Sequence, residues 1–337
     1  MNLESMRHPS RALTNLQVVS QPGLWLALLL VVAGGLAAPL TQSPTLRESM
    51  FLLLMFVALA SSLNILLGYT GYVSFGHIVF FGLGGYVGFY FLSQQQWPLL
   101  GAALAGGIAA GVLALLLGLS ILRLRGAYFA LATIGINEAM RAFINNFKPF
   151  GGPTGMSLNF TVYREYGGAA QALWLTYYAL LGLTLLVLVI SYIVKSSKFG
   201  LGLMSIREDE DAAIVMGVNA PRAKTWAFVL SALFPGIIGT LFFFKNGNIE
   251  PGDAFRLNLS IEIIVMVMLG GQGTVLGPVL GAALYERLRG YLLTSPLFKN
   301  LQLTFAGLVL LVIILFVPAG IVGWLRARWP RLRRLLE

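Results

Sequence analysis

The sequence contains few side chains that could serve as a nucleophile, a general base or a metal ligand. It has no cysteine, and its two histidines, His8 and His77, lie far apart in the chain. Thiolate chemistry is therefore excluded, and a histidine-based metal site or catalytic triad lacks its residues. The glycine-rich stretch 151–155 has no lysine that could hold a nucleotide phosphate. We expect no catalytic residue, no metal site and no cofactor bound by this chain.

Ionisable residues inside long apolar runs are the exception to this scarcity. Glu138 and Arg141 lie three residues apart, on one face of an expected helix, where they could form an intramembrane pair. Glu262 lies in a short apolar run and His77 follows a glycine-rich segment, both without an obvious partner nearby. Ionisable groups at membrane depth are costly and usually functional. A structural ion pair or an inter-helix hydrogen bond is the alternative for each.

Two glycine-rich segments, residues 68–77 and 270–278, interrupt apolar runs and mix glycine with hydroxyl or amide side chains. We call them the first and second breaks. Irregular backbone within lipid must be buried in protein or line a cavity, and paired broken helices mark the substrate path of many transporters. The candidate path residues are Gly68, Thr70, Gly71, Ser74, His77, Glu262, Gly271, Gln272, Gly273 and Thr274.

Close helix packing is the alternative explanation for the glycines, and it does not exclude a path. Gly273, Gly277 and Gly281 recur every four residues, as do Gly84 and Gly88. This spacing of small residues lets two helices approach closely.

A polar segment between residues 195 and 224 predicts a short amphipathic helix over residues 205–217. Ser205 can cap it, acidic residues follow in its first turns as the helix dipole prefers, and Gly217 ends it. Such a helix suits docking into a groove of a partner. A helix lying on lipid is the alternative, but the acidic run disfavours an anionic membrane surface. The expected docking residues are Glu208, Asp211, Ala212, Ala213, Met216 and Gly217.

The composition identifies the environment of these residues. The chain has 337 residues, of which 57% are hydrophobic and 11% are charged, against about 25% charged residues in soluble domains. The net charge of +10 fits lysines and arginines gathered in cytoplasmic loops better than binding to nucleic acid. We therefore expect an all-α integral membrane protein that contacts lipid and has no nucleic-acid partner.

Ten apolar stretches are candidate membrane spans. They cover residues 23–40, 50–67, 73–92, 98–122, 127–144, 170–194, 226–244, 257–271, 275–293 and 301–317. Reading 257–293 as one long helix gives nine spans and would place the arginine-rich C-terminus outside, against the positive-inside rule. We predict ten spans, both breaks on one side, and both termini in the cytoplasm. The expected regions are a cytoplasmic N-terminal tail (1–21), a transmembrane domain (22–323) and a basic cytoplasmic C-terminal tail (324–337).

Several motifs carry a family resemblance. Residues 211–217 read Asp-Ala-Ala-Ile-Val-Met-Gly, which resembles the Glu-Ala-Ala-x-x-x-Gly loop of ABC importer permeases with aspartate in place of glutamate. The stretches 64–77, 125–138, 151–155, 268–278 and 318–323 are similar, in matching order, to segments of the permease subunits of branched-chain amino acid ABC importers. The resemblance is to their LivM-like branch and covers roughly residues 50 to 323.

The resemblance implies a transport subunit in the inner (plasma) membrane of a bacterial-type cell. Its implied partners are a homologous LivH-like permease that forms a heterodimer, two cytoplasmic ABC ATPases that hydrolyse the ATP, and an external solute-binding protein. The expected docking helix would then be a coupling helix. Closure of the ATPases would act on it and drive alternating access, provided that each state makes different contacts.

Alternatives remain for the substrate and for the source of energy. Branched-chain or related amino acids are the first expectation, and relatives of the family that move urea or short-chain amides are the second. An ion-coupled secondary transporter would explain the spans and the breaks, but not the acidic docking helix. A membrane-embedded hydrolase would need a cluster of nucleophile, base or metal ligands that the sequence lacks.

Overall fold

The structure, a computed structural model, describes residues 22–159, 161–294, 304, 307–308, 311 and 320–328. Helices make up nearly all the regular structure of this part of the chain. The first seven are α1 (Pro22–Thr41), α2 (Pro44–Thr70), α3 (His77–Gln94), α4 (Leu99–Ile121), α5 (Ala127–Asn146), α6 (Thr161–Arg164) and α7 (Ala169–Ser196). The others are α8 (Lys198–Glu208), α9 (Glu210–Val215), α10 (Ala220–Asn246), α11 (Pro251–Ala254), α12 (Leu257–Gly270), α13 (Leu276–Thr294) and α15 (Gly320–Arg328).

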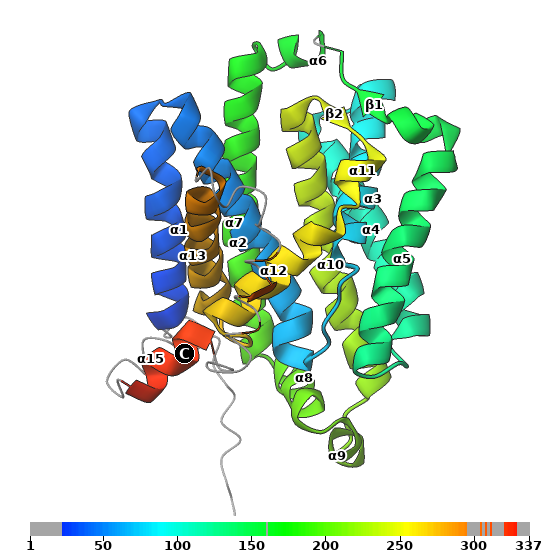
Figure 1. The fold of residues 1–337 in the computed structure, drawn as a ribbon, viewed down its shortest axis with the longest axis vertical. Coiled ribbons are helices and arrows are strands. Elements are labelled where there is room, and N and C mark those ends of the chain that lie inside the picture. Colours follow the sequence, from blue (N-terminus) through cyan, green and yellow to red (C-terminus); the bar gives the residue numbers. More distant parts are fainter. Residues whose placement is uncertain are drawn as a thin grey trace, which may run out of the picture.

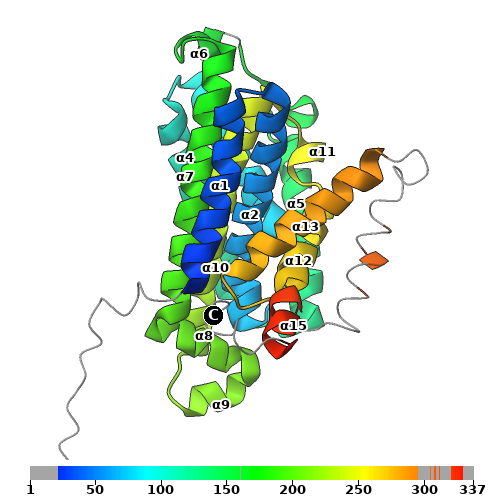
Figure 2. The ribbon, with the colours of Figure 1, turned by 90° about the vertical axis from the view of Figure 1, so that its left-hand side faces the viewer.

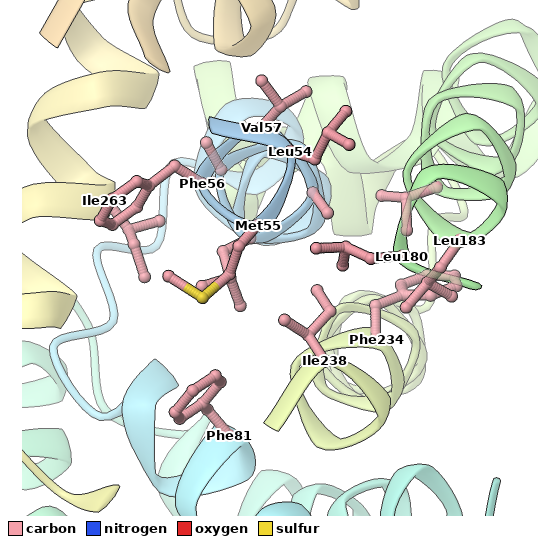
Figure 3. Close-up of a cluster of buried hydrophobic side chains, with 14 of the residues drawn as sticks. Leu54, Met55, Phe56, Val57, Phe81, Leu180, Leu183, Phe234, Ile238 and Ile263 are labelled. Atoms are coloured by element: carbon pink, nitrogen blue, oxygen red, sulfur yellow. The ribbon is translucent and has the colours of Figure 1, made fainter. Parts of the chain in front are cut away.

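The helix α2 forms the centre of the fold. Ser43 caps its start, where the hydroxyl accepts from the Leu46 amide, and Pro44 occupies the first turn. Gly71, with φ of +76°, ends it. Nearly every residue of its second half is buried, because α1, α7, α10, α12 and α13 all pack against it. Figure 3 shows part of the apolar core that α2 shares with α7, α10 and α12.

Glycines bring α3, α4 and α10 into close contact. A Cβ on Gly84 would lie 2.3 Å from the Gly236 Cα, and one on Gly88 would lie 2.1 Å from the Thr240 hydroxyl. Thr240 donates a hydrogen bond across this contact to the Gly84 carbonyl at 3.0 Å. Small residues that admit a neighbouring backbone are typical of helix packing within membranes. The packing explanation therefore holds for this pair of glycines.

The structure agrees with an all-α integral membrane protein. Five helices of its described part, α1, α2, α4, α7 and α10, are long and apolar enough to cross a membrane. Leu100, Leu104 and Ile108 on α4 are largely exposed, as expected for side chains that face lipid. Nine of the ten expected spans coincide with helices in the described residues, whereas the span 301–317 lies almost entirely outside them. The alternative of one long helix over 257–293 is wrong, because the chain turns at Gly271 between α12 and α13.

The two ends of the molecule differ in character. Helices α8, α9 and α15 lie at the lower end of Figure 1, where the first break begins at the end of α2. The upper end carries α6, α11 and a two-stranded sheet of β1 (Met156–Ser157) and β2 (Asn248–Ile249), paired antiparallel. In Figure 2, α13 leans away from the bundle formed by α1, α2 and α7. The expected boundary between residues 323 and 324 falls inside α15 rather than at its end.

Candidate coupling and translocation site

The two breaks contact one another, and Asn64 of α2 links them. Its Nδ2 donates to the Thr274 carbonyl at 3.0 Å, and its Oδ1 accepts from the Gly273 amide at 2.9 Å. Asn64 is completely buried. A side-chain amide both donates and accepts, so this residue satisfies two backbone groups that the turn between α12 and α13 leaves unpaired. We call this contact between the breaks the junction.

The junction requires glycine because its backbones lie so close. A Cβ on Gly68 would lie 2.6 Å from the Gly273 nitrogen, and one on Gly277 would lie 2.3 Å from the Gly271 carbonyl oxygen. Gly271 and Gly273 also have φ of +121° and +78°, a region that favours glycine. Packing accounts for these four residues, and the path-lining role expected of Gly68, Gly271 and Gly273 stays a prediction.

The hydroxyls at the junction are already engaged. Thr70 Oγ1 donates to a carbonyl one turn back in α2 at 2.7 Å. Thr274 Oγ1 donates to the Gly271 carbonyl at 2.8 Å and accepts from the Gly277 amide at 2.9 Å. Gln272 is half-buried in the same turn. In this conformation the two threonines stabilise backbone rather than offering hydrogen bonds to a solute.

Beyond Gly71 the first break rises toward the middle of the molecule before α3 begins (Figure 1). Ser74 and His77 are buried there, and the Ser74 hydroxyl has no hydrogen-bond partner in the described part of the chain. Helix α5 holds this segment, because Thr133 Oγ1 accepts from the Phe75 amide at 3.1 Å. Ser74 and His77 are thus separated from the junction and lie between helices.

Glu262 of α12 is buried, and its Oε2 has no hydrogen-bond partner among the described residues. Arg289 and Arg256 act on this carboxylate electrostatically. Arg289 of α13 also pairs with Glu286 at 3.4 Å. Within the described residues neither arginine forms an ion pair with Glu262.

Arg207 of α8 joins the polar segment to the junction. Its Nη1 donates to the Gly68 carbonyl at 2.8 Å, and a Cβ on Gly273 would lie 2.9 Å from the same nitrogen. The stem of Arg207 lies beside Gly71, whose absent side chain leaves room for it. One guanidinium thus contacts both breaks, and a movement of α8 would reach them directly.

The expected single helix over residues 205–217 is wrong, because the chain forms α8 and α9 with a bend at Asp209. Ser205 lies inside α8, where its hydroxyl donates a hydrogen bond to the Leu201 carbonyl one turn earlier. Asp209 is the cap of α9, and its Oδ1 accepts from the amides of Asp211 and Ala212 at 2.9 and 3.0 Å. A short carboxylate at this place satisfies two free helix amides, which favours a new start over continuation of α8.

Apolar side chains at the end of α9 face away from the protein. Val215 is 86% exposed and Met216 is 84% exposed, and Ile214 is also exposed. Ala213 does not belong to this surface, contrary to expectation, because it is buried against α8 and the start of α10. The other expected docking residues are exposed, namely Glu208, Asp211, Ala212 and Gly217. We call Ala212, Ile214, Val215 and Met216 the α9 surface.

A buried ion pair fastens α9 to the membrane helices. Lys224 of α10 donates to Glu210 at 2.7 Å, to the Tyr72 hydroxyl at 2.9 Å and to the Leu122 carbonyl at 2.9 Å. Tyr72 in turn donates to Glu210 at 2.9 Å. Lys224 also lies over the Tyr72 ring, 4.7 Å from its centroid. The network connects α9 to the first break, since Tyr72 belongs to that break.

A second pair holds α9 to the loop between α4 and α5. Arg125 donates to both carboxylate oxygens of Asp211, at 3.1 and 2.8 Å. The hydrogen bond and the charge of Arg125 lower the pKa of the Asp211 carboxyl below its usual value. A lowered pKa in the folded state stabilises the fold above the pKa of the unfolded chain, and this stabilisation is lost as pH falls through the lowered value. Because Asp211 and Arg125 are exposed, water screens the pair and its contribution is small.

Glu138 and Arg141 form the expected pair, with 2.8 Å between Oε2 and Nη2. Both side chains are about half exposed on α5, so the pair is not enclosed by this chain. Asn137 points inward instead and donates to the Phe255 carbonyl at 3.0 Å. Helix α5 is thus attached to the core by a buried amide and presents its ion pair outward.

Removing Lys224 should destabilise the protein more than removing an exposed lysine. Glu210 is only slightly exposed, and Lys224→Met removes its nearest cation. This loss is expected to cost about 3 kcal/mol of unfolding free energy. The thermal unfolding midpoint of the purified protein in detergent measures this, with Lys198→Met on exposed α8 as the control. Adding Glu210→Gln should recover part of the loss, because it removes a carboxylate whose remaining cation, the exposed Arg125, lies 3.6 Å away. Equal midpoints for both single variants would contradict the buried network.

Reasoning from sequence missed Asn64, Arg207, Lys224 and Tyr72 as parts of the site. Asn64 had a signal, because an amide inside a long apolar run is costly unless it has partners. Arg207 and Lys224 had none, since cations are expected in a polar segment whether or not they turn inward.

These features together define a membrane permease with an exposed segment that is connected to broken helices. Residues 45–317 match the family model described as "Branched-chain amino acid transport system / permease component". This match covers most of the chain, so the protein belongs to that family. It is a transport subunit rather than an enzyme, and the prediction of an ABC importer permease is confirmed.

The chain is similar to particular members of the family. It is 30% identical to the high-affinity branched-chain amino acid transport system permease protein LivM of Escherichia coli (strain K12), covering 90% of this chain and 75% of the relative. It is 24% identical to a LivH permease of Salmonella typhimurium, covering 80% and 91%. It is also 24% identical to a probable LivM permease of Methanocaldococcus jannaschii, covering 80% and 90%. No solved structure gives a significant match.

Proposed function

We propose that this chain is the LivM-like half of an ATP-driven importer that moves branched-chain or related amino acids inward. The 30% identity to the LivM protein of Escherichia coli, against 24% to a LivH protein of Salmonella typhimurium, supports this half of a heterodimer, with a LivH-like permease as the other half. Two ABC ATPases would supply the energy and an external binding protein would deliver the substrate. The chain would lie in the inner membrane with ten spans and both termini in the cytoplasm.

The observation that carries the proposal is the connection from the α9 surface to the junction. The surface is apolar and exposed, which suits burial in a groove of an ATPase. Behind this surface, hydrogen bonds connect Glu210 of α9 to Lys224 and to Tyr72 of the first break. Arg207 of α8 connects to the junction through its hydrogen bond to the Gly68 carbonyl. Movement of α9 on ATPase closure would therefore change contacts at the junction, as alternating access requires.

The candidate path divides into two parts under this proposal. The junction glycines and Arg207 would form the gate near the ATPases. Ser74, His77 and Glu262 would lie along the path above it, where buried polar groups could contact a passing zwitterion. The Glu138–Arg141 pair would lie beside the path or the second permease, because it faces outward from α5.

Uptake of radiolabelled leucine in cells with and without this chain tests the proposal. We expect deletion to remove an uptake that excess unlabelled valine inhibits and excess urea does not. Loss of urea-sensitive uptake instead would favour a urea or short-amide importer. Uptake that survives ATP depletion and collapses with the ion gradient would favour an ion-coupled secondary transporter.

A further inference from the structure

A cavity of about 220 Å³ opens at the end of the molecule opposite α9. It lies among α2, α3, the ends of α10 and α13, and the start of α12. Sites for drug-sized ligands measure about 300–1,000 Å³, so this volume suits a ligand of amino-acid size. The cavity is separate from the α9 surface and from the junction, since it shares none of their residues.

The inner part of the cavity is apolar. Met55 and Phe56 of α2, Phe81 of α3, and Phe242 and Phe243 of α10 contribute to its lining. Figure 3 shows Met55 and Phe81 facing one another across the space between α2 and α3, with Phe56 beside Ile263. Aromatic and thioether side chains favour contact with an aliphatic group.

The rim carries two cations and two anions. Arg256 and Arg289 provide the positive charges, and Glu250 and Asp253 around α11 provide the negative ones. Within the described residues no ion pair joins either cation to either of these carboxylates. A rim with separated charges of both signs is complementary to a ligand that carries both an anion and a cation.

Arg289 is the best placed of these groups to anchor a ligand. Its guanidinium lies over the Phe56 ring, 5.5 Å from the centroid, at the boundary between the apolar and charged parts. Glu286 engages its Nη1 at 3.4 Å, but its buried Nε has no hydrogen-bond partner among the described residues. A ligand carboxylate would satisfy this nitrogen, because guanidinium and carboxylate match in a two-point geometry.

We propose that this cavity is the outward-facing binding site for a zwitterionic aliphatic amino acid. The carboxylate pairs with Arg289, the ammonium group lies toward Glu250 and Asp253, and the aliphatic side chain enters the apolar part. The inference rests on the proposed function and adds a place where this permease itself selects its substrate. It also disfavours urea, which has no charge for the rim and no chain for the apolar part.

Leucine uptake by the whole importer in proteoliposomes tests the site. Arg289→Gln is expected to raise the KM for leucine at least ten-fold with a smaller change in kcat. Arg287→Gln is the matched control, because Arg287 lies two residues away on the same helix and is exposed; its KM should equal that of the wild type. Equal KM values for the two variants would overturn the assignment.

Protection from labelling tests occupancy without relying on transport. The chain has no native cysteine, so Asn248→Cys at the cavity and Glu165→Cys at an exposed turn can be labelled individually within the whole importer. Leucine should slow labelling at 248 several-fold and leave labelling at 165 unchanged. 3-Methylbutylamine, which lacks the carboxylate, and 4-methylpentanoate, which lacks the ammonium group, should not protect.

The outcomes separate the two proposals. Wild-type leucine uptake with no protection at 248 would overturn the site and leave the proposed function intact. No labelling at 248 even without leucine would mean that another subunit fills the cavity, which also overturns the site. Absence of leucine uptake by the wild type would overturn the proposed function, while protection by leucine would still support the site.

Discussion

Replacing Arg207 with alanine is expected to lower leucine uptake by ten-fold to a hundred-fold while ATP hydrolysis continues. Its guanidinium is the group that touches both breaks, through the Gly68 carbonyl at 2.8 Å and the close approach to Gly273. A hydrogen bond from a charged group contributes about 1.5–3 kcal/mol, which corresponds to that range of effect. Uptake and ATP hydrolysis measured on the same proteoliposomes separate lost coupling from lost assembly.

Arg222→Ala is the control for this prediction. Arg222 is exposed at the start of α10, and its side chain makes no ion pair among the described residues. We expect wild-type uptake and hydrolysis from it. If Arg207→Ala reduced hydrolysis and uptake in equal proportion, Arg207 would support assembly of the complex rather than transmission between α8 and the junction.

A negative charge on the α9 surface should abolish transport without disturbing the fold. Val215→Asp and Met216→Asp place a carboxylate where the proposal expects an apolar contact with an ATPase. Burying an unpaired charge costs several kcal/mol, so uptake and co-purification of the ATPases should fall more than a hundred-fold. The amount of protein in the membrane and its unfolding midpoint should not change, because both side chains point away from it.

Two further substitutions make this prediction specific. Asn219→Asp adds the same charge close by and preserves the cap of α10, since aspartate caps a helix as well as asparagine does; it should leave uptake unchanged. Ala213→Asp should instead lower the unfolding midpoint, because Ala213 is buried within the chain. Normal ATPase binding by Met216→Asp would exclude the α9 surface as the docking site.

The membrane helices could be predicted because their signals are local. Helix α2 contains the apolar run 50–67, begins at Pro44 after its cap Ser43 and ends before Gly71, and each of these signals acts through the backbone of its own turn. The breaks were also visible as glycine-rich interruptions. Their contact was not, because Asn64 and Gly273 are 209 residues apart in the chain, and one sequence carries no information on which distant segments pair.

The error in the polar segment has a physical cause as well. Several consecutive residues there can cap a helix or occupy its first turn, so the sequence alone does not choose between Ser205 and Asp209. The choice depends on tertiary partners, since Lys224 and Arg125 hold Glu210 and Asp211 in place. The same partners rotate α9 so that Ala213 faces inward and Met216 faces outward. The presence of a helix was therefore predictable here, whereas its first and last residues and the side chains that it buries were not.

The most direct test of the account is leucine accumulation by the reconstituted importer. Proteoliposomes would contain this chain, its LivH-like partner and both ATPases, with the external binding protein and radiolabelled leucine on the side opposite the ATPases. The account predicts accumulation that requires hydrolysable ATP and is lost with Met216→Asp but kept with Asn219→Asp. Accumulation without ATP, or equal accumulation by Met216→Asp and the wild type, would contradict it.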